Sequence, residues 1–88
     1  MATSGVEELS MRLLEAFYDL ADGKLKQPVS MEEATRASGL DTTSTEPDVA
    51  LRYLLNGSHL EAADETAGTY EINVPGMDKV RQQRGLDS

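Results

Sequence analysis

The N-terminal segment constrains the fold more than any other part of the chain, because its apolar side chains recur at the three- and four-residue spacing of a helix. The main stripe and the residues that widen it are Val6, Leu9, Leu13, Leu14, Phe17, Tyr18 and Leu20. Ser4 and Glu7 fit a capping box before this stripe, and Gly23 fits a helix stop after it. We therefore expect an amphipathic helix over about residues 5–22, and the rest of the chain must fold against its apolar side.

A second helix is predicted from local signals alone. Val29 is the expected centre of a very short strand, and Ser30-Met31-Glu32-Glu33 is a capping box that starts a helix directly after it. The helix should run to Ser38, where Gly39 can serve as the left-handed terminator and Leu40 can return to the core.

A polar turn over residues 41–45 separates this helix from a third one. Thr45 is expected to cap the third helix, and Pro47 lies in its first turn, where a missing amide hydrogen is harmless. The segment 49–55 is apolar almost all round, which predicts a deeply buried helix. Its obvious outward positions are Asp48, Arg52 and Asn56, and residues 56–58 end it.

The remainder of the chain is predicted to form a hairpin and a short helix. Residues 59–63 and 69–74 are the expected strands, because Tyr70, Ile72 and Val74 alternate with polar residues as in a half-buried strand. Pro75-Gly76 is expected to break the second strand, and residues 77–84 can make two helical turns.

This order of elements resembles a winged helix-turn-helix domain, and the likeness extends without gaps from about Leu14 to Val80. The segment VSMEEATRASGLD is similar to the second helix and turn of that family, ALRYLLNGSHLEA to its third helix and first wing strand, and GTYEINVPGMDKV to its return strand and trailing helix. The resemblance implies one α+β, mostly helical domain over residues 1–88, ordered from about 5 to 84. It would have a three-helix core, a two- or three-stranded antiparallel wing and a short C-terminal helix. Ser58-His59-Leu60 stands where the family usually reads glycine, leucine and isoleucine, so we expect an irregular start to the wing.

In this family the third helix usually enters the DNA major groove and the wing touches adjacent phosphates, which gives candidate contact residues by position. They are Thr45, Asp48, Arg52 and Asn56 on the third helix, with Asp64, Glu65 and Thr66 at the wing tip. Arg52 and Asn56 have the groups that read base edges, whereas Asp48 and the acidic wing tip would repel phosphates. Two interpretations of Arg52 stay open, namely a base contact and an ion pair with Asp48 one turn back.

Two further sets of residues are candidates for contacts. In winged-helix proteins the first and last helices often make dimer contacts, and the first helix offers Met11, Leu14 and Tyr18 beside its main stripe. A wide core-facing stripe explains these three residues equally well. The one basic cluster is Lys79, Arg81 and Arg84, which can grip phosphates or complement the dipole at a helix C-terminus.

Composition narrows the classes of function. Among 88 residues, 16 are acidic and 8 basic, and the formal net charge of −8 repels phosphate backbones and anionic membranes. This charge fits either an ordinary solvated acidic surface or a salt-adapted organism. With no cysteine and one histidine, His59, neither a disulfide framework nor a metal site is expected, and His59 is interpreted as structural rather than as a ligand or pH switch. The chain has no apolar run long enough for a membrane span and no secretory pattern, so a cytoplasmic protein is expected.

The sequence offers no set of residues that suggests a catalytic site, and no cofactor is expected. It favours a non-catalytic interaction module, in transcription or its regulation, that meets a protein partner or a second copy of itself. The alternative is a DNA-binding regulator that reads the major groove with Arg52 and Asn56. A continuous basic face built from Arg36, Arg52 and the C-terminal arginines would favour DNA, whereas an acidic face with an apolar patch would favour protein.

Overall fold

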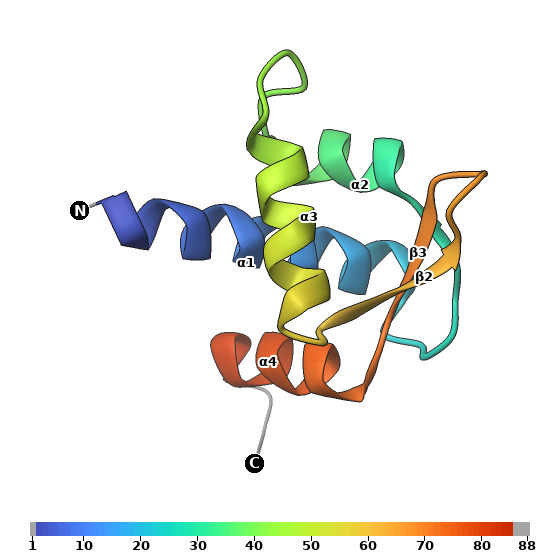
Figure 1. The fold of residues 1–88 in the computed structure, drawn as a ribbon. Helices are drawn as coiled ribbons and strands as arrows, with labels where there is room; N and C mark the ends of the chain where they lie inside the picture. The colour runs from blue at the N-terminus through green and yellow to red at the C-terminus, as the bar shows by residue number, and fades with distance from the viewer. Residues whose placement is uncertain (1, 86–88) are drawn as a thin grey trace.

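The computed structural model describes residues 2–85, with side chains from Gly5 onward, and these residues form an α+β fold. Its elements are α1 (Ala2–Leu20), β1 (Val29–Ser30), α2 (Met31–Ser38), α3 (Glu46–Asn56), β2 (Leu60–Asp64), β3 (Thr69–Ile72) and α4 (Val74–Arg84). Figure 1 shows α1 crossing the molecule as its central helix, with α3 in front of it, α2 and the β2–β3 hairpin to one side and α4 below. Helix α1 contacts α2, α3 and α4, so it is the element around which the others pack.

The three strands form one antiparallel sheet in the order β1-β3-β2. Val29 lies opposite Tyr70 across β1 and β3, and Leu60 lies opposite Ile72 across β2 and β3. The register shifts between Ala62 and Asp64, so the far end of the hairpin is irregular. The predicted strand 59–63 is displaced by one residue, and the return strand ends two residues earlier than predicted.

The core lies between α1 and the elements that surround it. Leu13, Leu14 and Phe17 on α1 are fully buried, and the ring of Phe17 meets Tyr70 edge to face with the ring centroids 6.4 Å apart. The other buried apolar residues come from all parts of the fold: Ala16, Ala21, Val29, Ala34, Leu40, Ala50, Leu54, Leu60, Ile72, Met77 and Val80. Within the predicted stripe, Leu13, Leu14 and Phe17 therefore form the centre of the core, and Leu9 and Tyr18 are partly buried against it. Val6 is half-buried outside this core, and Leu20 is 40% exposed.

The predicted start of the first helix is wrong, whereas the predicted cap and stop of the second helix are confirmed. Helix α1 begins at Ala2, so Ser4 lies inside the helix and the predicted capping box with Glu7 is wrong. The helix ends at Leu20, and left-handed backbone at Asp22 and Gly23, with φ of 57° and 68°, turns the chain away. For α2 the predicted cap is confirmed, because the Ser30 side chain accepts a hydrogen bond from the Glu33 amide at 3.5 Å. Gly39 ends the helix with φ 78°, and Leu40 after it is buried.

Helix α3 is not deeply buried, and the prediction that it would be is wrong. Only Ala50 and Leu54 are buried, while Val49 and Tyr53 are 40% and 43% exposed. The physical reason is that α3 packs on α1 with one side, and no described element covers the opposite side. Thr45 does occupy the cap position, but its side chain makes no capping hydrogen bond within the described residues.

The start of α4 differs from the prediction. The helix starts at Val74, so Pro75-Gly76 lies in its first turn instead of breaking a strand, and Val74 is exposed rather than half-buried. The side-chain oxygen Oδ1 of Asn73 caps the helix by accepting from the Gly76 backbone amide at 3.1 Å, and the side-chain nitrogen Nδ2 donates to the Ser58 backbone carbonyl at 2.6 Å. Ser58 has a left-handed φ of 62°, which is the irregularity expected at this point. Asn73 therefore joins the start of α4 to the start of the hairpin.

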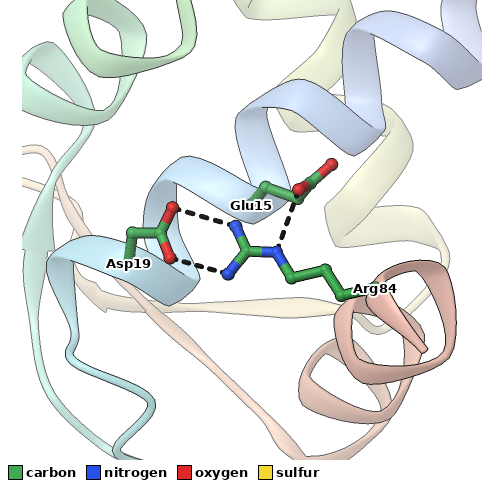
Figure 2. Close-up of polar contacts among 3 residues, drawn as sticks. All are labelled: Glu15, Asp19 and Arg84. Atoms are coloured by element: carbon green, nitrogen blue, oxygen red, sulfur yellow. Dashed lines mark hydrogen bonds and ion pairs between the residues drawn. The ribbon is translucent and has the colours of Figure 1, made fainter. Parts of the chain in front are cut away.

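Arg84, at the last turn of α4, ties that helix to α1 (Figure 2). Its Nη1 and Nη2 atoms donate to both carboxylate oxygens of Asp19 at 2.9 Å, and Nε donates to Glu15 at 3.1 Å. The guanidinium also lies 5.3 Å from the ring centroid of Tyr18. The hydrogen bonds that Arg84 donates to Asp19, more than the one it donates to Glu15, raise the pKa of Arg84 above its ordinary value. Arg84 is thus engaged within the fold and is not a free phosphate ligand.

Replacing Arg84 with glutamine should lower the free energy of unfolding by about 1 kcal/mol, because a forked ion pair and a cation–π contact are lost at a partly exposed site. Urea unfolding followed by circular dichroism measures this change, and high salt should shrink it. Arg36→Gln is the matched control, since its pair with Glu32 is longer, 3.6 Å, and far more exposed. Equal losses in the two variants would contradict a special role for Arg84.

Candidate interaction surface

The outer face of α3 is the surface of interest, and we define it as Thr45, Asp48, Val49, Arg52, Tyr53 and Asn56. All six residues are exposed, and their spacing of three and four places them on one side of the helix. The four polar members are the predicted contact residues, so the structure brings these together as expected by position. Val49 and Tyr53 were missed, because an apolar residue in an apolar segment gives no sign of which side of the helix lacks a neighbour.

Two of the arginines that would build a continuous basic face are engaged in ion pairs. Arg36 is paired with Glu32 on its own helix, and Arg84 is held by Asp19 and Glu15 on α1. Arg52 and Asp48 are both described, and their side chains do not approach within the 4.0 Å of an ion pair in this part of the structure. The charges of Arg36 and Arg84 are therefore offset by carboxylates, which weighs against a basic face that would favour DNA.

The tip of the hairpin is built from its acidic residues. The Asp64 carboxylate accepts hydrogen bonds from the backbone amides of Thr66 and Ala67 at 3.1 and 3.3 Å, which shapes the turn. Glu65 and Thr66 are exposed. Residues 64–69 contain no lysine or arginine, so this tip has no cation with which to contact a phosphate.

The candidate dimer surface on α1 needs correction. Leu14 is 0% exposed and belongs to the core, so it is not available on a surface. The reason is that the core-facing stripe of α1 is wider than one row of residues and includes Leu14. Met11 and Tyr18 are half-buried, and Tyr18 lies beneath the Arg84 guanidinium. Met11 remains as a partly exposed residue on α1.

A small pocket lies beside the outer face of α3, between that helix, α1 and α4. Its volume is about 150 Å³. Its walls are Glu7, Ser10, Met11 and Leu14 from α1, Tyr53 and Leu54 from α3, Lys79 and Gln83 from α4, and His59 from the segment before β2. Tyr53 belongs to both the pocket and the outer face of α3, so the two features are continuous.

His59 contributes the one imidazole of the chain to this pocket. Burial lowers the pKa of His59 below its ordinary value of 6.5, and the positive charge of Lys79 lowers it further. The Nδ1 atom is buried and has no hydrogen-bond partner among the described residues. A neutral imidazole therefore stands in the pocket wall at neutral pH.

The lowered pKa predicts the direction of a pH effect on stability. Because the unfolded chain takes up the histidine proton first, the stability that neutral His59 contributes is present above pH 6.5 and is lost as the pH falls below it. Urea unfolding of the wild type and of His59→Gln at neutral and mildly acidic pH should show a steeper loss in the wild type. In an NMR titration of the imidazole, Lys79→Gln should raise the pKa only part of the way, because burial is the larger cause. If stability fell with pH equally steeply in the wild type and in His59→Gln, the expected contribution of neutral His59 to stability would be contradicted.

The described residues contain no group of three or more histidine, cysteine, aspartate or glutamate side chains placed to hold a metal ion. Among the helices described, none has both the length and the apolar character needed to cross a membrane. Searches of protein-family models, of curated proteins and of solved structures found no significant match to this chain. The interpretation of the surface therefore rests on its geometry and chemistry.

Proposed function

We propose that this chain is a cytoplasmic, non-catalytic winged-helix module, acting in transcription or its regulation, that binds a protein partner through the outer face of α3. The observation that carries the proposal is the exposure of Val49 and Tyr53, four residues apart on that face. An apolar pair flanked by polar residues is typical of the core of a protein interface, where aromatic residues are enriched. To a phosphate backbone Val49 offers no polar contact and Tyr53 only a single hydroxyl.

The order of elements supports the winged-helix part of the proposal. A helix, a short strand, two helices, a hairpin and a last helix follow one another, and the short strand completes a sheet in the order β1-β3-β2. In such a domain the outer face of α3 and the hairpin would form the binding side. Here that side carries Asp48 on the helix and Glu65 at the tip of the hairpin.

Binding to DNA is the second candidate, because Arg52 and Asn56 are exposed together on the same face. The charge balance weighs against it, since the net charge is −8 and Arg36 and Arg84 are engaged in ion pairs. The same net charge also disfavours self-association, because two copies of the chain repel each other. A partner of opposite charge is the better match for this surface.

A capture experiment with paired variants tests the proposal. Wild-type protein and the double variant Val49→Ser/Tyr53→Ser are compared, with Leu25→Ser as the control because Leu25 is equally exposed, at 46%, but lies in the loop before β1. A protein retained by the wild type and the control is purified, and its affinity is measured by calorimetry. The double variant should weaken binding by about tenfold or more, as expected for an aromatic residue at the centre of an interface.

Two further measurements decide between the candidates. Mixed-sequence duplex DNA is titrated into labelled protein at low salt, which gives phosphate attraction its greatest strength. Amide shifts gathered at residues 48–56 and at the hairpin would replace the protein-partner proposal with DNA binding. Sedimentation of the protein alone over a range of concentrations should show a monomer, and a dimer that the double variant dissociates would replace the separate partner with a second copy.

A further inference from the structure

The pocket beside α3 has the size of a single ring. Its volume of about 150 Å³ matches that of cavities known to hold one benzene molecule. One wall is an exposed tyrosine, Tyr53, and another is the half-buried Met11, with the core residues Leu14 and Leu54 behind them. Such a space is too small for a nucleotide or an extended cofactor and large enough for one side chain.

The chemistry of the pocket is divided between apolar walls and polar edges. Met11 and Tyr53 supply the accessible apolar surface, in front of the buried Leu14 and Leu54, and a methionine sulfur makes favourable contacts with aromatic rings. Glu7 on α1 and Lys79 and Gln83 on α4 are exposed polar residues of the lining. An aromatic ring that carries a hydroxyl group would therefore find both apolar contact and hydrogen-bond partners.

We propose that this pocket receives one tyrosine side chain, presented by a basic segment of the protein partner that docks on the outer face of α3. The inference rests on the proposed function and names the chemistry of the partner. Its phenol ring would lie against Met11 and Tyr53, with the buried Leu14 and Leu54 behind them. Its hydroxyl would meet the polar groups of Lys79 and Gln83.

The continuity of the pocket with α3 favours a protein segment over a free small molecule. Tyr53 lines the pocket, and Val49 extends the apolar surface one turn further along the helix. A free ring would leave Val49 uncovered, whereas a polypeptide that anchors one ring in the pocket can cover both residues. Lys79 and Arg52 offset the carboxylates of Glu7 and Asp48 on this surface, so the preference for lysine or arginine residues beside the anchor comes from the net charge of −8 of the whole chain.

The pocket is tested first with the side-chain analogues of tyrosine and phenylalanine. p-Cresol and toluene are titrated separately into labelled protein, and the methyl signals of Met11, Leu14 and Leu54 are followed by NMR. We expect saturable shifts with p-cresol in the millimolar range, and weaker binding of toluene because it lacks the hydroxyl. Met11→Trp fills the pocket from α1 and Gln83→Trp, at an exposed position, covers it from α4; each should abolish the shifts, while Leu25→Ser should retain them.

The anchor is then placed in peptides of opposite charge. Acetyl-Lys-Lys-Tyr-Lys-Lys-amide should bind more tightly than acetyl-Glu-Glu-Tyr-Glu-Glu-amide, and its shifts should extend from the pocket to Val49. Absence of p-cresol shifts at the pocket would overturn the inference and leave the α3 surface standing if the Val49→Ser/Tyr53→Ser variant still loses its partner. Binding of p-cresol without any difference between the peptides would overturn the basic partner. Equal binding of toluene and p-cresol would overturn the choice of tyrosine.

Discussion

Replacing Gly76 with alanine should lower the free energy of unfolding by about 2–4 kcal/mol, although alanine is the better helix former. Gly76 lies in the first turn of α4 and is buried against the segment that begins the hairpin. A Cβ atom at this position would overlap the backbone carbonyl oxygen of His59 and lie 2.9 Å from Cγ1 of Ile72. Neither the backbone oxygen nor a fully buried isoleucine can move away cheaply, so the helix would have to shift.

Gly5→Ala is the matched control for this prediction. Gly5 is also helical, in α1, but a Cβ atom there would meet nothing within 4 Å. The same substitution should therefore raise stability by up to about 1 kcal/mol, through helix propensity alone. Urea unfolding followed by circular dichroism measures both variants. A Gly76→Ala protein as stable as the wild type would mean that α4 does not approach the hairpin this closely.

The sequence predicted best where the signal is local. The strand at Val29, the cap at Ser30 and the stop at Gly39 depend on a few adjacent residues, and each is found as expected. Pro75-Gly76 was misread because proline ends a strand but also suits the first turn of a helix, and only the preceding Asn73 as a cap separates the two cases. Such signals are ambiguous when strand and helix are contiguous.

Burial could not be predicted in the same way, because it depends on which elements lie alongside. Val49, Tyr53 and Ala50 are all apolar members of one helix, yet only Ala50 faces α1. The outward polar positions, Asp48, Arg52 and Asn56, could be predicted since polar residues in an apolar segment must find water. The pocket could not, because its walls come from three helices that are distant in sequence.

Replacing Leu14 with alanine should lower the free energy of unfolding by about 3–5 kcal/mol, the range for large cavities made in a close-packed core. The side chain is 0% exposed, between α1 and the helices packed on it, and a chain of this size has little core to spare. Leu20→Ala removes the same atoms from a 40% exposed position on the same helix and should cost less than about 1 kcal/mol.

The dependence of this loss on protein concentration tells core from dimer surface. If Leu14 packs within one molecule, the loss in Leu14→Ala is the same at every concentration, because unfolding is then unimolecular. If it lay in a dimer contact, wild-type stability would rise with concentration, and the difference between wild type and variant would grow with it. A concentration-independent loss together with a small effect of Leu20→Ala would place Leu14 in the core, directly behind the pocket beside α3. The same residue would then link the stability of the fold to the shape of the proposed partner site.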